Sequence, residues 1–204
     1  MYNIYQTEGM ILGGTNQREA NRFFYIFSEN FGLLRATAQS VREVKSKLRY
    51  GLQDFSLSQF ALARGKGAWR ITNVACHGNL YYALRAEKEK LRIVARLASL
   101  LKQLLPNEIE NKNLYQIVRT AVSFLETTSL TAENIEDFEK IILLRILRDL
   151  GYFNETKPIS KQETYGVFFN NINWDLALLD KMNPIKRQAI LDINDALNAT
   201  HLLF

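Results

Sequence analysis

The sequence of 204 residues predicts an α+β protein with two domains, a small five-stranded β-barrel at residues 1–78 and an all-helical domain at residues 79–204. Three observations support this prediction. Short β-rich segments separated by turn residues fill the chain up to Gly78. Apolar residues recur at helical spacing after it. The net charge of +5 lies entirely on the first part, because residues 79–204 hold sixteen basic and sixteen acidic residues.

Five strands are expected in the first domain, at residues 2–12, 22–27, 33–39, 57–63 and 69–75. Gly13–Gly14 is expected to end the first strand, and Gly65–Lys66–Gly67 to join the last two as a hairpin turn. Five short strands within 78 residues favour a closed barrel, because closure leaves no exposed sheet edge. The basic stretch at residues 41–53 is expected to be partly helical or a mobile loop.

Four helices are expected in the second domain, over residues 80–105, over residues 113–127, after Thr131 and after Asn183. Pro106 lies just past the end of the first. Thr131 fits an N-cap that is followed by acidic residues, and Gly151 fits the C′ position of the same helix. Asn183–Pro184 fits an N-cap followed by proline at the first helical position.

The composition excludes several classes of site. Cys76 is the only cysteine, which excludes a disulfide framework, and two histidines leave no zinc site built from Cys and His. Phosphate-loop, dinucleotide-binding and zinc-protease motifs are absent, and the acidic residues alternate with lysines as on solvated helix faces. We therefore expect no enzyme, no catalytic residue, no cofactor and no metal.

No secretory signal or long apolar stretch is found, so a cytoplasmic protein that does not enter a membrane is expected.

Basic residues cluster in the first domain, and this is the strongest local signal of a ligand. A cationic groove binds DNA by releasing condensed counterions, and single strands also need rings on which bases stack. Solvated surface and core packing are the alternative interpretations of such cations and rings. The candidate DNA-binding residues are Arg35, Arg42, Lys45, Lys47, Arg49, Lys66 and Arg70, and the candidate stacking rings are Phe23, Tyr25, Phe27, Tyr50 and Trp69.

A series of motifs in fixed order resembles the RecO recombination mediator family. They include YQTEGMIL at residues 5–12, AQSVR at 38–42, KSKL at 45–48, WRIT at 69–72, LGY at 150–152 and NDALNATHL at 194–202. The resemblance implies an OB-fold barrel and a helical domain that bind single- and double-stranded DNA and anneal complementary strands. It further implies work with RecR, and help in loading the RecA recombinase onto DNA coated by single-stranded-DNA-binding protein.

Two features depart from that family. Many members carry a four-cysteine zinc element after the LGY motif, whereas residues 154–173 of this chain contain no cysteine. The family usually has a glycine before the basic segment, where this chain has Ser40. The helical half is also shorter than usual, so its partner surfaces are expected to be reduced.

The resemblance assigns protein contacts to the helical half, including capture of the acidic, apolar C-terminal tail of single-stranded-DNA-binding protein. We hypothesise that cations of the expected helix 80–105 flank such a groove, because they share one face at helical spacing. The alternative is that they pair with Glu87 and Glu89 on a solvated face. These cations are Arg85, Lys88, Arg92 and Arg96.

The sequence thus predicts a non-enzymatic, DNA-binding recombination mediator associated with the nucleoid. The main alternative is a helical interaction scaffold whose barrel is purely structural, and a second is an enzyme such as a nuclease.

Overall fold

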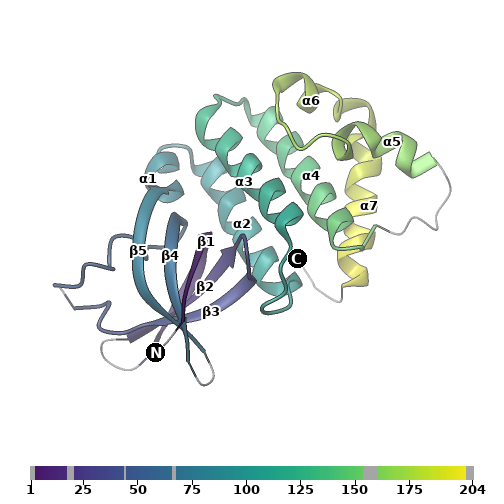
Figure 1. Cartoon of the computed structure of the whole chain (residues 1–204). Coiled ribbons are helices and arrows are strands. Elements are labelled where there is room, and N and C mark those ends of the chain that lie inside the picture. The colour runs from purple at the N-terminus through teal and green to yellow at the C-terminus, as the bar shows by residue number, and fades with distance from the viewer. Residues whose placement is uncertain (1–2, 18–20, 44, 66–67, 154–159, 201–204) are drawn as a thin grey trace. The chain divides into compact units, whose positions relative to one another are not determined.

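A computed structural model describes residues 3–17, 21–43, 45–65, 68–153 and 160–200 of the chain (Figure 1). The chain forms two compact units, Met1–Tyr115 and Gln116–Phe204. The predicted boundary at residue 78 separates strands from helices, whereas the first compact unit also includes the first two helices. No helix within the described ranges combines the length and the apolar character needed to cross a membrane.

Five strands of the first unit form a closed barrel in the order β1-β2-β3-β5-β4. Strands β3 and β5 pair in parallel and all other neighbours pair antiparallel. This confirms the predicted α+β class with an N-terminal OB-like barrel. The strands are β1 (Ile4–Gln17), β2 (Asn21–Ser28), β3 (Gly32–Ala38), β4 (Ser56–Arg64) and β5 (Trp69–Asn79).

Strand β1 is longer than predicted, because Gly13 and Gly14 lie inside it. The register shifts between Ile11 and Gly13, where Gly13 has a φ of +130°, a conformation that L side chains rarely adopt. Such a bulge bends a strand and increases its twist. The strand therefore pairs with β4 along its first half and with β2 along its second half.

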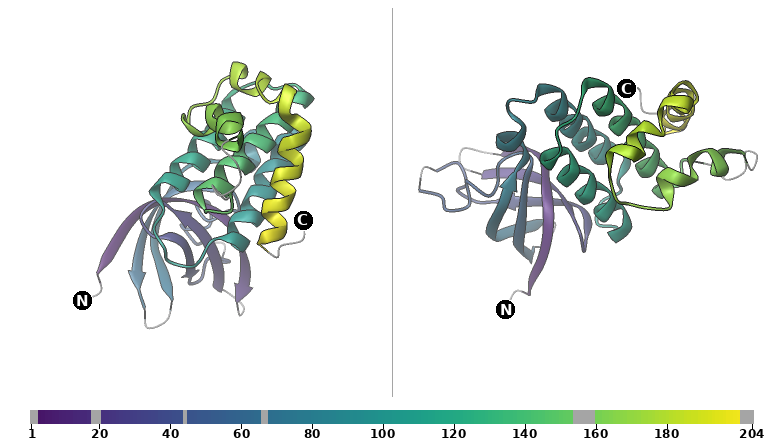
Figure 2. Two further views of the ribbon diagram at one scale, coloured as in Figure 1. Left: turned by 90° about the vertical axis from the view of Figure 1, so that its right-hand side faces the viewer. Right: turned by 90° about the horizontal axis from the view of Figure 1, so that it is seen from above.

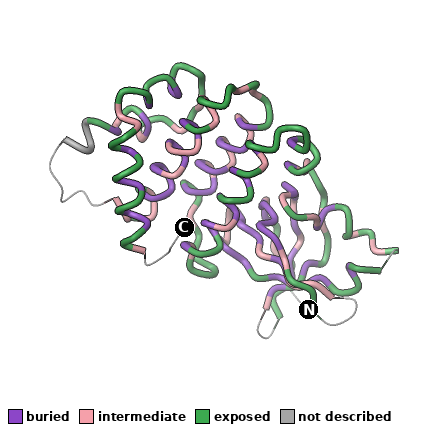
Figure 3. The backbone as a smooth tube through the Cα atoms, turned by 180° about the vertical axis from the view of Figure 1, so that it is seen from behind, coloured by how far each residue is buried: buried purple, intermediate pink, exposed green. Residues whose placement is uncertain are grey.

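The barrel core contains inward-facing side chains from all five strands. Figure 3 shows many buried positions in the strands of the barrel, and in β3 buried positions alternate with less buried ones, as expected when one face of a sheet is solvated. The residues with the least exposure include Ile11, Phe24, Ile26, Leu34, Phe60 and Leu62. Val41 and Leu52, from the stretch between β3 and β4, complete this core.

The single helix predicted at residues 80–105 is wrong, because the chain forms α1 (Leu80–Leu84) and α2 (Lys88–Leu104) instead. Asn79 caps α1 by accepting a hydrogen bond from the Tyr82 amide. The break at residues 85–87 places the Glu87 carboxylate 2.6 Å from the buried ammonium of Lys90. An unpaired buried ammonium would be costly, so this ion pair stabilises the break.

The helices of the second unit follow the predicted order. They are α3 (Lys112–Thr127), which begins in the first unit, α4 (Ala132–Asp149), α5 (Ser160–Phe169), α6 (Leu176–Asp180) and α7 (Lys186–Ala199). Thr131 caps α4 in a reciprocal capping box with Asn134, and Gly151 has a φ of +78° beyond its end. Asn183–Pro184 instead opens a 3-10 turn, and α7 begins only at Lys186.

Arg145 organises the interior of the second unit, although it stands in the most apolar run of the sequence. Its Nε donates to the Phe168 carbonyl at 2.7 Å, and its terminal nitrogens donate to the carbonyls of residues 171, 172 and 173. The guanidinium also lies over the Trp174 ring, 4.2 Å from its centroid. Burial lowers the pKa of Arg145 to about 10. Around this residue α4 packs against α5, α6 and α7, with α7 drawn in yellow in Figure 2.

Candidate nucleic-acid interface

The outer surface of strands β2 and β3 carries two aromatic rings beside an arginine. Phe23 and Tyr25 point outward because the side chains between and beyond them, Phe24 and Ile26, fill the barrel core. The guanidinium of Arg35, which pairs with Tyr25 across the strands, lies 5.6 Å from the Tyr25 ring centroid and 5.9 Å from that of Phe23. Both rings remain partly exposed.

Arg70 extends this surface onto β5. It pairs with Thr37 in the parallel ladder, next to the inward-facing pair of Ala36 and Trp69. Thr37 and Arg70 therefore point to the same side of the sheet as Arg35. We call Phe23, Tyr25, Arg35, Thr37 and Arg70 the outer face.

Two of the five candidate rings are buried, so the prediction that they stack on bases is wrong. Phe27 has the outward register of Tyr25, but Tyr115 covers it with ring centroids 5.5 Å apart. Trp69 points into the core, against Tyr5 and Phe31. Tyr50, by contrast, is 78% exposed.

Residues 39–55, here called the basic segment, form consecutive turns, and no helix is present at its described positions. The amides of Glu43, Ser46 and Arg49 each donate to the carbonyl three residues earlier. The segment is also anchored, since Val41 and Leu52 are buried in the barrel core and Leu48 packs against it. The predicted partial helix is therefore wrong at the described positions of the segment, and whether the loop is mobile stays a prediction. Its four cations, Arg42, Lys45, Lys47 and Arg49, are all exposed.

Ser40, where the resemblance implies a glycine, has a backbone conformation that suits glycine. Its φ of +51° lies in the left-handed region that favours glycine. The Ser40 amide donates to the side-chain oxygen of Asn21 at 3.1 Å, which holds the turn against β2. The serine thus keeps a backbone conformation that glycine would adopt without strain.

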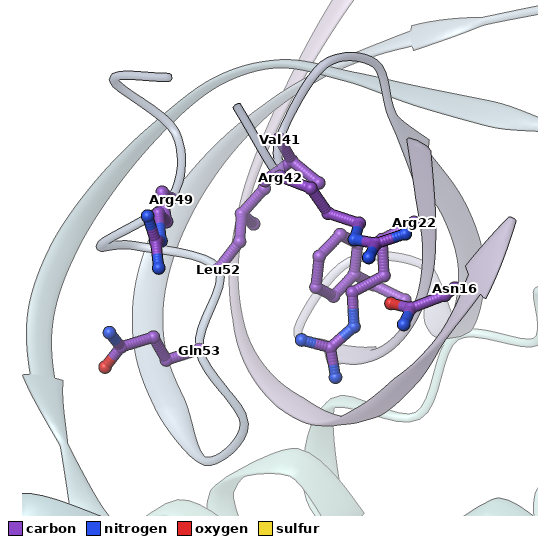
Figure 4. Close-up of a pocket in the computed structure, with 8 residues that line it drawn as sticks. Asn16, Arg22, Val41, Arg42, Arg49, Leu52 and Gln53 are labelled. Atoms are coloured by element: carbon purple, nitrogen blue, oxygen red, sulfur yellow. The ribbon is translucent and has the colours of Figure 1, made fainter. Parts of the chain in front are cut away.

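A pocket of about 430 Å³ opens between the basic segment and the ends of β1 and β2 (Figure 4). Arg22 and Asn16 lie on one side, Arg49 and Gln53 lie on the other, and Val41 and Leu52 lie between them. The lining is completed by Arg42 and Phe24. Arg22 from strand β2 and two arginines from the basic segment, Arg42 and Arg49, therefore face one space.

Arg22 was absent from the predicted site, although its position could have indicated a role. It has the inward register of Phe24 and Ile26, which is unusual for a charged residue in a small barrel. It donates to the Asp54 carboxylate at 2.8 Å, and its guanidinium lies 5.0 Å from the Phe24 ring centroid. A Cβ at Gly14 would stand 3.0 Å from the Arg22 Nε, so the glycine makes room for this side chain.

The predicted DNA-binding residues fall into two groups on the barrel. Arg35 and Arg70 belong to the outer face, whereas Arg42 and Arg49 line the pocket. Lys45 and Lys47 lie on the exposed basic segment. Lys66 lies outside the described residues.

The predicted partner-binding cations are not on one helix. Arg85 follows the end of α1, while Lys88, Arg92 and Arg96 lie on α2 at intervals of four residues. The Arg92 guanidinium pairs with Glu89 at 2.8 Å, and both side chains are more than half exposed. For Arg92 this geometry favours the solvated-face alternative.

Within the described ranges, no group of three or more His, Cys, Asp or Glu residues is arranged to hold a metal ion. Residues 154–159, part of the cysteine-free stretch 154–173, lie outside these ranges. The absence of zinc therefore stays a prediction from the missing cysteines.

Comparison with known proteins gives matches to RecO proteins. Residues 1–80 match the family model described as recombination protein O N terminal. The chain is 26% identical to the DNA repair protein RecO of Acetivibrio thermocellus over 150 residues, which is 74% of this chain and 58% of that protein. It is 27% identical to RecO of Clostridium perfringens strain 13 over 73% of this chain and 59% of that protein.

A match to RecO of Synechocystis sp. has a higher identity, 33% over 135 residues, and covers 66% of this chain and 49% of that protein. The chain thus spans between half and three fifths of the length of these relatives.

Proposed function

Because the chain belongs to the RecO family, we propose that it is a DNA-binding recombination mediator in DNA repair that works without catalysing a covalent reaction. The observation that carries this proposal is the outer face, where Arg35 lies against the partly exposed rings of Tyr25 and Phe23. Rings and cations placed side by side on a small barrel are what single-stranded DNA requires.

The two kinds of side chain would have separate tasks. Bases stack on Phe23, Tyr25 and Tyr50, which favours unpaired strands over duplexes but does not select a sequence. Arg35, Arg70 and the cations of the basic segment bind phosphates, which are common to single- and double-stranded DNA. Binding is therefore expected to be independent of sequence and strongly dependent on salt.

Membership of the family supports four further parts of the proposal. The protein anneals complementary strands, works with RecR, binds the C-terminal tail of single-stranded-DNA-binding protein, and helps to load recombinase on single-stranded DNA. We also propose a cytoplasmic, nucleoid-associated location. Annealing fits a surface that contacts phosphates and ring faces, because it leaves the pairing edges of the bases free.

The test is the salt dependence of single-strand binding by the full chain. Replacing Arg42, Lys45, Lys47 and Arg49 by Ala should lower the slope of log K against log salt by roughly 0.7 for each phosphate that the variant no longer binds. The matched control replaces Arg85, Lys88, Arg92 and Arg96 by Ala, which removes the same formal charge from α1 and α2. The control should keep the slope, since those cations do not belong to the basic segment.

The same two variants separate DNA binding from partner binding. In a titration with the tail peptide of single-stranded-DNA-binding protein, the control variant should lose affinity and the basic-segment variant should keep it. A wild-type chain that binds the peptide but no DNA at moderate salt would instead support the interaction-scaffold alternative. A strand-annealing assay followed by fluorescence then tests the mediator role itself.

A further inference from the structure

Helix α7 has one side that packs within the second unit and one side that faces solvent (Figure 2). Its buried residues, which include Ala189, Ile193 and Leu197, lie on the side that packs against α4. On the opposite side Leu191 is 59% exposed, and the neighbouring Ile190 is 42% exposed. Two large apolar side chains on one helix therefore remain available to another molecule.

We propose that this side of α7 binds the same side of a second copy of the chain. A two-fold axis perpendicular to a helix places the helix of the second copy antiparallel to the first, and each contact then occurs twice. With the axis at Leu191, the Leu191 side chains of the two copies meet, because packed helices lie about 8–10 Å apart. Ile190 lies at the edge of the same contact.

The charges on either side of Leu191 match this arrangement. Arg187 lies four residues before Leu191, and Asp195 lies four residues after it. Residues at this spacing share one side of a helix. An antiparallel pair centred on Leu191 therefore places Arg187 of each copy opposite Asp195 of the other, which allows two ion pairs.

The structure leaves both of these charges available. Arg187 and Asp195 are exposed, and neither makes an ion pair among the described residues. The neighbouring Lys186, by contrast, already pairs with Asp137 at 2.9 Å. One cation and one anion beside an apolar centre make the surface complementary to itself. DNA or a wholly acidic peptide would instead meet Asp195 with a like charge, so a second copy fits this surface better.

The contact is small, so a weak dimer is expected. The fourteen residues of α7 span about 21 Å. Stable interfaces bury about 1,200–2,000 Å² in total, and a single pair of such helices buries less. We expect a dissociation constant of about 10–100 µM, which should rise with salt because the ion pairs lie at the surface. The dimer needs no DNA, so this inference stands apart from the proposed function.

The experiment is sedimentation equilibrium of the full chain without DNA, at low salt and over concentrations that bracket the expected dissociation constant. Arg187→Asp and Asp195→Arg should each weaken self-association about tenfold, because each variant turns both attractive pairs into repulsive ones. The matched control is Lys181→Asp, which changes the charge as much as Arg187→Asp does, at an exposed position outside α7. The control should dimerise as the wild type does.

An equimolar mixture of Arg187→Asp and Asp195→Arg tests the pairing itself. The new carboxylate of one variant faces the new guanidinium of the other, so the mixture should associate as strongly as the wild type. A variant that failed to fold could not restore association, so the mixture also controls for folding.

A wild type that stays monomeric over the whole range would overturn the inference and leave this side of α7 to a different protein. A wild-type dimer that neither variant weakens would place the contact elsewhere on the chain. If both variants are weakened but their mixture associates no better than either alone, the pairing of Arg187 with Asp195 is refuted.

Discussion

Removing the ring of Tyr25 separates stacking from charge on the outer face. Stacking of a base on an aromatic side chain contributes about 1–3 kcal/mol. Arg35 already lies against the Tyr25 ring at 5.6 Å from its centroid, and the ring is only partly exposed, so we expect the lower half of that range. Tyr25→Ala should then weaken single-strand binding by roughly five- to thirtyfold, since 1.4 kcal/mol corresponds to tenfold.

The charge of the protein does not change in this variant, so the salt dependence of binding should not change either. Fluorescence anisotropy with an oligothymidylate over a series of salt concentrations measures both quantities. Tyr25→Phe keeps the ring and should bind almost as the wild type does, whereas Arg35→Gln should lower the slope by roughly 0.7. Unchanged affinity of Tyr25→Ala, or a slope that falls as far as in Arg35→Gln, would refute the division into stacking and charge.

Three further predictions concern stability. Ser40→Gly should raise the free energy of unfolding in urea by about 0.5–1 kcal/mol, because the strain of an L-residue at a left-handed φ exceeds the entropic cost of ordering a glycine. Ser46→Gly serves as the control. A loss of stability in Ser40→Gly would contradict the reasoning. Arg145→Met should destabilise the protein by about 3–5 kcal/mol, because it removes four hydrogen bonds of a largely buried guanidinium, one of them to the buried Phe168 carbonyl, while the exposed Arg187→Met should stay within about 0.5 kcal/mol. Chelators should leave thermal unfolding unchanged, and stoichiometric zinc found by metal analysis of the purified protein would disprove this.

Side-chain alternation made most of the barrel predictable. In β3 the buried Leu34, Ala36 and Ala38 alternate with Arg35 and Thr37, and this period of two is visible in the sequence. The end of β1 was mispredicted because two consecutive glycines usually mark a turn. Here Gly13 forms a bulge instead, which lets one strand pair with both β2 and β4.

The break between α1 and α2 has no comparable signal. Residues 80–104 contain no glycine or proline, so local propensity favours one continuous helix. At the break Lys90 is buried and its ammonium pairs with the Glu87 carboxylate. Burial of a lysine depends on which elements pack over it, and the sequence alone does not indicate that.

The sequence indicates which residues form the candidate site, but it does not indicate how they are arranged in space. The cluster from Arg42 to Arg49 is evident in the sequence, yet nothing there shows that Val41 and Leu52 fix its two ends in the barrel core. Aromatic residues gave the weakest guidance. Phe27 has the same outward register as Tyr25, and only Tyr115, far along the chain, decides that one ring is buried and the other is partly exposed.

Strand β2 explains why a stacking surface and an arginine pocket occur together on so small a barrel. A strand that fills a core on one side must point every second side chain outward, so Phe23 and Tyr25 reach the surface without any loss of core packing. At the beginning of the strand the inward position is occupied by Arg22, whose guanidinium pairs with the Asp54 carboxylate. The turn held by Ser40 then brings Arg42 to the same opening. The arrangement therefore needs only one alternating strand and one anchored segment, because β2 supplies both the outward rings and Arg22, and Val41 and Leu52 anchor the segment that carries Arg42 and Arg49.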